Sequence, residues 1–282
     1  MPELPELEVM QEVLSEKIIG RTIIAATSFH PGILKTVEPG LDVLVGKHVR
    51  AVSRHGKHLV FTLADDLHLV AHLMLAGRLI LCQSNTKATK ATGFLISFDD
   101  GGDLRLIENT KTHRARVHIV REILDVESLA TMGVEPLSDD FTLEYLLQYV
   151  QGLRRQLKKL LMDQTMIAGI GSAYADEILF DAQLSPIRYG TTVRDDEIER
   201  LYASIRSVLQ WALTEVRAGA GGATLAPHKR GFLRVYAKTE TPCPECGTSI
   251  AEIRYAQTKT YYCPSCQAQG ATIRDRRSWL TR

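Results

Sequence analysis

The sequence lacks a long apolar run, and its overall charge is close to neutral. No stretch of the 282 residues approaches the roughly 18 consecutive apolar residues that span a bilayer, and we find no N-terminal secretory signal. We therefore expect a protein of the cytoplasm, with no membrane partner. With 45% hydrophobic and 24% charged residues the chain can build a large core, and its length favours several domains over one.

Cysteine is also scarce, and the five residues present are not evenly spread. Four form two Cys-x-x-Cys pairs that 16 residues separate, Cys243 with Cys246 and Cys263 with Cys266. This spacing is typical of a zinc ribbon, in which two tight turns meet around one tetrahedral ion. Disulfides are the alternative, but the missing secretory signal and the unpaired fifth cysteine disfavour them. We predict one structural Zn²⁺ held by four thiolates, with residues 249–262 as a two-stranded hairpin between the pairs, and Cys82 as a buried packing residue.

The formal charge of +1 conceals an uneven distribution along the chain. From Pro227 onward there are ten Lys and Arg against four Asp and Glu, whereas the preceding residues carry a net charge of −5. A basic zinc module joined to an acidic body favours a polyanionic partner bound at one face, and nucleic acid is the usual one. A solvated run of charges is the alternative that charge alone leaves open.

The first six residues, Met-Pro-Glu-Leu-Pro-Glu, suggest a chemical role for the chain terminus. Removal of Met1 would leave Pro2 with a secondary amine as its free terminus. A terminal amine titrates well below a lysine, and the start of a following helix would lower its pKa further. Such an amine can attack an aldehydic carbon to give an iminium, and Glu3 could move protons for that reaction. The alternative is an ordinary exposed terminus.

Residues 1–132 read as strands preceded by one helix. Pro5 suits the first helical position and Gly20 follows the end of the apolar stripe. Short alternating or apolar runs then lie between turns that carry Gly or Asp, which is typical of antiparallel strands. They occupy residues 48–53, 59–63, 67–73, 77–81, 94–98 and 104–107. We predict a β-sandwich of roughly eight strands.

Residues 133–226 read as helical. Apolar residues recur at helical spacing from Asp195 to Arg217, which predicts an amphipathic helix. Earlier, Gly169-Ile-Gly171-Ser172 precedes a short helical run from Ala173 to Phe180. Two glycines allow backbone N–H groups to approach a ligand closely, and we take Ser172 as the N-cap, so this turn is a plausible phosphate site.

In combination these motifs resemble the formamidopyrimidine-DNA glycosylase / endonuclease VIII family of base-excision repair enzymes. The resemblance covers Pro2 to Cys266 and rests on motif order: Pro-Glu-Leu-Pro-Glu at the start, Lys57 in Gly-Lys-His-Leu, the link Gly-Val-Glu-Pro-Leu-Ser at 133–138, the glycine turn, and the four cysteines. It implies an α+β multidomain protein. Its parts would be an N-terminal β-sandwich (1–132), a helix-two-turns-helix domain (133–226), a zinc-finger hairpin (227–268) and a basic tail (269–282), with DNA gripped between sandwich and helical domain.

The resemblance also implies residue roles. Pro2 would attack C1′ of a damaged nucleotide, Glu3 would shuttle protons, Glu6 would hold the terminus, and Lys57 would clamp a phosphate. Leu75 would fill the space that an extruded base leaves. Further DNA contacts would come from Gly171, Ser172, Thr258 and Lys259.

Four departures from the family pattern limit what carries over. Ser172 replaces the usual Asn, Thr258 the usual hairpin Arg, and Leu75 the usual Met. Lys259 supplies charge beside Thr258 without the guanidinium fork. The fourth departure is residues 108–116, where the family's Asp-Pro-Arg-Arg-Phe-Gly loop is replaced by a longer segment without Phe.

We therefore predict a bifunctional DNA glycosylase and abasic-site lyase, working as a monomer with one structural Zn²⁺ on damaged DNA in a bacterial nucleoid. Ring-opened purines, oxidised pyrimidines and abasic sites are favoured over 8-oxoguanine. The alternative is a DNA-binding relative that recognises distorted DNA and has lost base excision.

Overall fold

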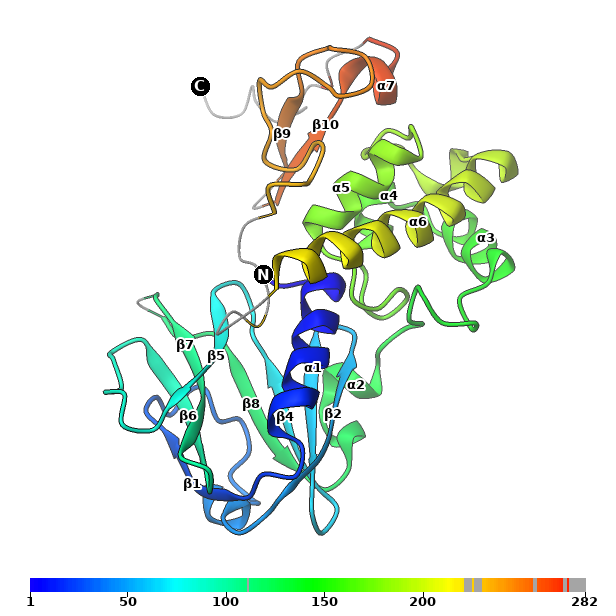
Figure 1. The fold of residues 1–282 in the computed structure, drawn as a ribbon. Coiled ribbons are helices and arrows are strands. Elements are labelled where there is room, and N and C mark those ends of the chain that lie inside the picture. The colour runs from blue at the N-terminus through cyan, green and yellow to red at the C-terminus, as the bar shows by residue number, and fades with distance from the viewer. Residues whose placement is uncertain (111, 221–224, 226–229, 256–257, 271–272, 274–282) are drawn as a thin grey trace. The chain divides into compact units, whose positions relative to one another are not determined.

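A computed structural model describes the chain except residues 111, 221–224, 226–229, 256–257, 271–272 and 274–282 (Figure 1). It divides into two compact units. The first comprises Met1–Met132 and Leu213–His228, and the second Gly133–Ala212 and Lys229–Arg282. The architecture is α+β, with a β-sandwich in the first unit and, in the second, a helical region and a small hairpin module. No helix among the described residues is long and apolar enough to cross a bilayer.

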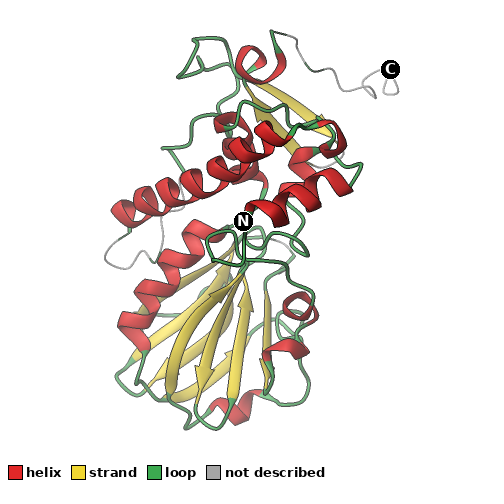
Figure 2. Cartoon of the chain, turned by 90° about the vertical axis from the view of Figure 1, so that its right-hand side faces the viewer, coloured by secondary structure: helices red, strands yellow, loops and turns green. Residues whose placement is uncertain are grey.

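The sandwich consists of two four-stranded antiparallel sheets, whose strands are drawn in yellow in Figure 2. One sheet has the order β1-β6-β7-β5 and the other β2-β3-β4-β8. The strands are β1 (Ile23–Ser28), β2 (Val49–His55), β3 (His58–Leu63), β4 (Leu67–His72), β5 (Gly77–Gln83), β6 (Thr92–Phe98), β7 (Gly102–Glu108) and β8 (Arg116–Val120). The predicted β-sandwich is confirmed.

Side chains from both sheets meet in the sandwich core. Phe61 and Leu69 of one sheet and Phe94, Ile96 and Leu106 of the other line the same interior space, and all five are buried. On β6 the buried Ile96 lies between the half-buried Leu95 and Ser97, which is the period-2 pattern of a strand with one buried face. Burial of this alternating face holds the two sheets together.

Helix α1 (Leu4–Ile18) lies against β2 (Figure 1). Its buried face is apolar and includes Leu7, Met10 and Leu14. The helix begins at Leu4, so Pro5 is not at the first helical position as predicted but one residue later. Here Glu3 takes the N-cap position with a capping box. The remaining short elements of this unit are the 3₁₀ turns Leu41–Leu44 and Ile123–Asp125 and helix α2 (Glu127–Ala130).

The helical region of the second unit contains α3 (Leu143–Gly152), α4 (Leu157–Leu161), α5 (Ser172–Asp181), the 3₁₀ turn Gly190–Thr192 and α6 (Asp195–Gly219), whose last residues belong to the first unit. Its entry is fixed by backbone pairing. Gly133 donates to Gln164 O, and Val134 forms a bridge with Ile167. A Cβ on Gly133 would lie 2.2 Å from the backbone of Met166, so only glycine fits this crossing.

The hairpin module contains β9 (Ala251–Tyr255), β10 (Thr258–Tyr262) and α7 (Pro264–Ala268). β10 pairs antiparallel with β9 and packs against α5. The predicted hairpin is present, although its turn residues 256 and 257 lie outside the described part of the chain. The predicted boundary at 226/227 and most of the predicted basic tail, 269–282, also lie outside it.

Cys82 differs from its prediction. It lies on β5 near the strand's end and is only half-buried. The apolar run from Leu79 to Cys82 suggested full burial, but the strand leaves the core at this point and its last residues have one face toward solvent.

Candidate functional site

The N-terminal turn holds its acidic residues in a reciprocal pair of hydrogen bonds. The Glu3 amide donates to Glu6 Oε2 at 2.9 Å, and the Glu3 side chain accepts from the Glu6 backbone. Glu3 and Glu6 are 3% and 4% exposed, and Pro2 is half-buried. These two hydrogen bonds fix the backbone at the start of α1. A terminal amine at Pro2 would therefore be followed directly by Glu3, whose carboxylate is held by the Glu6 backbone.

Lys57 lies in the turn between β2 and β3, and an arginine outside the predicted set connects that turn to α1. The guanidinium of Arg54 contacts the Glu8 carboxylate and donates from Nη1 to Gly56 O at 3.0 Å. Gly56 has a φ of +55°, which glycine adopts without strain. Lys57 itself is 7% exposed. Arg54 thus couples the lysine turn to the helix that carries the terminus.

Leu75 is presented by a rigid turn between β4 and β5. Leu75 is 64% exposed. The Met74 amide donates to His72 Nδ1 at 3.1 Å, and Gly77 N donates to Leu73 O at 2.9 Å. A Cβ on Gly77 would lie 2.4 Å from Leu73 O. The turn therefore has little freedom and holds Leu75 outward.

His72 lies beside Lys57 and His58. His58 and His72 are register partners on β3 and β4, with ring centroids 4.6 Å apart. Burial, then the positive charge of Lys57, lowers the pKa of His72 to about 4. Burial, then His72, lowers the pKa of His58 to about 3, and its Nε2 lies 2.9 Å from the Ser128 hydroxyl. Both rings are neutral at pH 7, so the positive charges beside them come from Lys57 and from Arg116, the register partner of His72 on β8.

The glycine turn before α5 is braced by one glutamine. Gln164 Nε2 donates to Met162 O and to Ile170 O at 2.9 and 2.7 Å, and its Oε1 accepts from Gly169 N at 3.0 Å. Gly169 has a φ of +82°. Gly171 is the N-cap of α5 and Ser172 its first residue, so the N-cap prediction for Ser172 is wrong. The Ser172 hydroxyl instead reaches Lys259 O at 3.4 Å, because the packed hairpin offers it an acceptor.

A buried ion pair joins α4 and α5 to β10. Lys158 Nζ lies 2.7 Å from Asp176 Oδ1 and donates to Lys259 O at 2.7 Å, while Asp176 Oδ2 accepts from Tyr261 N at 3.1 Å. Both charged side chains are at most 5% exposed. Burial raises the pKa of Asp176 to about 7, and Lys158 opposes that rise. Thr258 is half-buried, and Lys259 Nζ lies 3.1 Å from a Glu252 carboxylate oxygen.

The four cysteines of the hairpin module form a compact sulfur cluster. Their Sγ atoms all lie within 4.8 Å of one another. Cys243 and Cys266 are 4.0 Å apart, and Cys246 and Cys263 3.5 Å. With Zn–S bonds of about 2.3 Å, a tetrahedral ion separates its sulfurs by roughly 3.8 Å, whereas a disulfide requires about 2.05 Å. The cluster fits one structural Zn²⁺.

The surroundings of the cysteines suit a metal. Gly247, with a φ of +74°, closes the first turn by donating to Cys243 O, and the Cys263 amide donates to Gln267 Oε1. Hydrogen bonds from Thr248 lower the pKa of the Cys246 thiol to about 6, whereas burial raises the pKa of Cys266. A thiol whose pKa is raised by burial, such as that of Cys266, becomes a thiolate at neutral pH when it binds a metal cation.

Comparison with known proteins assigns these features to one family. Family models match at residues 1–115 (formamidopyrimidine-DNA glycosylase N-terminal domain), 132–224 (formamidopyrimidine-DNA glycosylase H2TH domain) and 241–269 (zinc finger found in FPG and IleRS). A formamidopyrimidine-DNA glycosylase of Carboxydothermus hydrogenoformans is 35% identical over 274 residues, covering 95% of this chain and all of the relative. The chain belongs to the formamidopyrimidine-DNA glycosylase family. A glycosylase of Pelotomaculum thermopropionicum is 33% identical over 95% of this chain and 99% of its own.

Solved structures agree with this family assignment. The Lactococcus lactis family enzyme in complex with DNA containing an abasic site has a TM-score of 0.86 at 27% identity, over 94% of this chain and 99% of that one. The same enzyme in complex with a tetrahydrofuran-containing DNA and an inhibitor has a TM-score of 0.87 at 29% identity, over 95% and 100%. The zinc-finger family model and the sulfur geometry together confirm the predicted structural zinc.

Within each unit the structure brings some predicted site residues together. In the first unit Glu3 and Glu6 share one helical turn, and the Glu8–Arg54 contact links that helix to the Lys57 turn. In the second unit Ser172 meets the backbone of Lys259. Arg54, His72 and the Lys158–Asp176 pair were not predicted. The only sequence feature that could have pointed to His72 is its position directly before the Leu75 turn. Arg54, Lys158 and Asp176 could not be found from the sequence, because their partners are distant along the chain.

Proposed function

We propose that this member of the formamidopyrimidine-DNA glycosylase family excises damaged bases and cleaves the resulting abasic site. Pro2, freed by removal of Met1, attacks C1′ as the base departs and forms an iminium. Glu3 moves the protons for base loss and sugar-ring opening. Loss of the 3′ phosphate by β-elimination and then of the 5′ phosphate by δ-elimination completes strand cleavage.

The capping box at the start of α1 is the observation that supports this proposal most. It fixes Glu3 next to Pro2 and leaves Glu6 to hold the turn. Lys57, kept beside neutral histidines, clamps a phosphate near the lesion, and Leu75 enters the stack after base extrusion. Gly171, Ser172, Thr258 and Lys259 contact the DNA backbone. We further propose that the protein acts as a monomer in the bacterial cytoplasm.

Borohydride trapping on abasic-site duplex DNA tests the amine mechanism. We expect a covalent complex with the wild type, because borohydride reduces the iminium. The Pro2→Gly variant and a form that retains Met1 should lose at least 100-fold in trapping, since the secondary amine is absent from both. Equal trapping by the Met1 form would contradict the mechanism.

The DNA-binding alternative is favoured by two features, Thr258 on the hairpin and the segment 108–116. Glu108 is 2% exposed and accepts from Arg114 N at 2.8 Å and Ala115 N at 3.0 Å, so its carboxylate holds the end of this segment. A panel of single-lesion duplexes separates the two functions. Excision of a ring-opened purine or oxidised pyrimidine supports the glycosylase, and binding without excision supports the alternative.

A further inference from the structure

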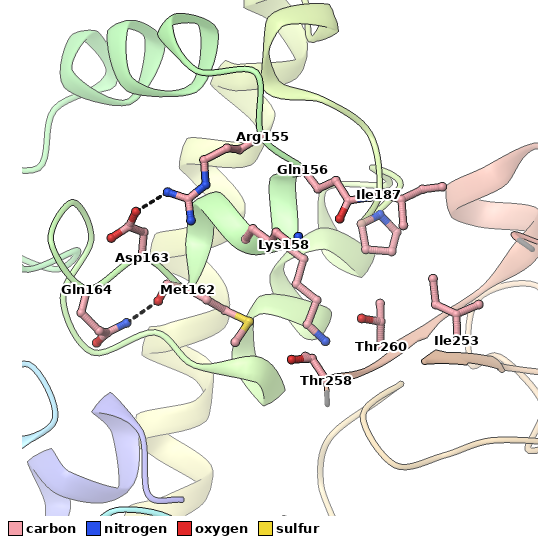
Figure 3. A pocket seen from close by; sticks show the side chains of 12 residues that line it. Arg155, Gln156, Lys158, Met162, Asp163, Gln164, Ile187, Ile253, Thr258 and Thr260 are labelled. Atoms are coloured by element: carbon pink, nitrogen blue, oxygen red, sulfur yellow. Dashed lines mark hydrogen bonds and ion pairs between the residues drawn. The ribbon is translucent and has the colours of Figure 1, made fainter. Parts of the chain in front are cut away.

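The second unit contains a cavity of about 350 Å³, which lies in the size range of small-ligand sites. The start of α4 and the turn after it form one wall, and the connector at Pro186 and Ile187 continues it. The opposite wall is the hairpin. Figure 3 shows Gln156 and Ile187 across the cavity from Thr258 and Thr260. Among the described residues no cysteine lines the cavity, whereas Thr258 belongs both to its lining and to the proposed DNA contacts.

The walls are held in place by interactions that do not need a ligand. Leu157 N donates to Arg188 O and Lys158 N to Pro186 O, which joins α4 to the connector. The Lys158–Asp176 pair fixes the hairpin wall through Lys259 O. Arg155 is paired with Asp163 at the opposite end (Figure 3). The cavity is thus largely formed in advance, which reduces the ordering cost of binding.

The lining divides into an apolar part and a polar part. Ile187, Ile253, Pro186 and Met162 supply aliphatic surface. Thr260 is the register partner of Ile253, and Thr258 lies two residues earlier on the same face of β10, so this wall presents two hydroxyls in line with one aliphatic group beside them. Gln156 adds an amide from the other side.

Cations outnumber acids around the cavity. Arg155, Lys158 and Lys159 line it; Lys158 is paired with Asp176 and Arg155 with Asp163, so these three cations and two carboxylates leave a net charge of +1. Arg155 and Lys159 are exposed, so they lie where a soluble anion would enter. The guanidinium of Arg155 has five N–H donors and can address a second anion while it contacts Asp163.

We propose that this cavity binds a nucleotide, with its base against the aliphatic surface, its base edge or sugar on the threonines and Gln156, and its phosphate at Arg155 and Lys159. A flat base packs well against aliphatic side chains, and the edge of a base or sugar can form hydrogen bonds with hydroxyl and amide groups. A phosphate is bound by cationic side chains. The nucleotide is either free or an unstacked unit of a DNA strand, and the second source rests on the proposed function.

The experiment uses the full-length, zinc-loaded protein and follows the methyl NMR signals of Ile187 and Ile253. Thymidine 5′-monophosphate, thymidine and inorganic phosphate are titrated separately, and abasic duplexes with and without a single-stranded extension are compared by anisotropy. Ile187→Trp fills the cavity, and Gln156→Ala removes one polar group. Leu124→Trp is the control, because Leu124 is 64% exposed in the other unit.

We expect the wild type to bind the monophosphate at least tenfold more tightly than thymidine or phosphate. The monophosphate should bind tenfold more weakly to Ile187→Trp and threefold more weakly to Gln156→Ala. Its affinity for Leu124→Trp should be unchanged. If only the extended duplex loses affinity in Ile187→Trp, the nucleotide is part of DNA, and the proposal also holds. Phosphate binding as tight as the monophosphate, or no effect of Ile187→Trp on any probe, overturns it. Pro2-dependent trapping at saturating DNA should be equal in all variants, so failure of this site leaves the proposed function standing.

Discussion

His58 and His72 show how burial of single residues makes the sandwich sensitive to acid. Each ring is neutral in the folded protein, with its pKa lowered from 6.5 to about 3 for His58 and to about 4 for His72. A depressed pKa contributes stability that is present above pH 6.5 and is lost as pH falls through the folded value. Acid therefore destabilises the first unit before most carboxylates titrate.

We expect the free energy of unfolding of the first unit to fall between pH 6.5 and pH 4, with about 3 kcal/mol of that loss due to His58. Amide hydrogen exchange in β3 at several pH values measures it without assuming that the whole chain unfolds together. The His58→Gln variant should lose that part of the pH dependence, and His48→Gln should keep it. Identical slopes in wild type and His58→Gln would show that His58 does not carry the effect.

At this scale the sequence predicted residues whose role depends on local motifs. The four cysteines stand in a recognisable spacing along the chain, and their role as zinc ligands is confirmed. The roles of Lys57 and Leu75 also rest on their neighbours in sequence and stay predictions. Arg54 and Asp176 were out of reach, because their partners are 46 and 18 residues away and only the folded chain brings them together. The N-cap prediction for Ser172 missed by one residue, because helix ends are the least certain part of a helix pattern and Gly171 takes that position.

At the scale of elements, the buried Lys158–Asp176 pair attaches the hairpin to helices α4 and α5. Asp176 joins Lys158 to the Tyr261 amide, so one carboxylate connects three elements. Removing one partner of a buried ion pair leaves a charge without compensation, which typically costs about 3 kcal/mol or more.

We expect Asp176→Asn to destabilise the second unit by about 3 kcal/mol, and the double variant Lys158→Met/Asp176→Leu to recover most of this loss. Hydrogen exchange of the Tyr261 amide reports the change directly. Asp196→Asn, which breaks the exposed Arg194–Asp196 pair, is the control and should leave exchange unchanged. Unchanged exchange of the Tyr261 amide in Asp176→Asn would show that the ion pair does not stabilise the attachment of the hairpin.

The zinc module is an element whose fold depends on its metal. Its apolar cluster has six buried residues, of which Phe180 comes from α5 and two are the cysteines Cys243 and Cys263. A core this small does not offset the entropy of ordering the segment, so the metal supplies the stability.

Chelation of zinc, or Cys243→Ser, should unfold residues 241–269 and weaken DNA binding at least tenfold while the sandwich stays folded. Circular dichroism, methyl NMR and DNA anisotropy with and without added Zn²⁺ measure the three effects. Cys82→Ser is the matched control, because Cys82 lies on β5 away from the cluster. Full DNA affinity in metal-free protein would contradict a binding role for the hairpin.

Sequence patterns were sufficient for most elements and not for their ends. Apolar patterns located six of the eight sandwich strands and the long helix α6, because a period of 2 or 3.6 is a property of the chain itself. They did not locate β1 and β8. Several strand ends moved by one or two residues, as at β7, predicted from Leu104 but starting at Gly102. Those ends depend on cross-strand hydrogen bonds that no single segment reveals.

At the scale of the whole molecule, positive charge is concentrated at the C-terminal end of the chain and negative charge in the residues before it. The residues from Pro227 onward carry a net charge of +6, and the preceding residues −5. Four arginines, Arg274, Arg276, Arg277 and Arg282, lie in the last nine residues, outside the described part of the chain. An acidic body repels DNA at a distance, so the basic end determines which face approaches first.

We expect a chain cut after Gly270 to bind abasic duplex DNA with a shallower salt dependence than the full chain. Each phosphate contact contributes about 0.9 to the slope of log K against log salt concentration, so loss of two or three arginine contacts lowers the slope by roughly 2 to 3. Anisotropy titrations from about 50 to 200 mM salt measure it. The full-length chain with all four arginines changed to Gln is the matched control and should behave like the shortened chain. Equal slopes for all three proteins would exclude phosphate contacts by this segment and leave the hairpin and the helical region as the source of the salt dependence.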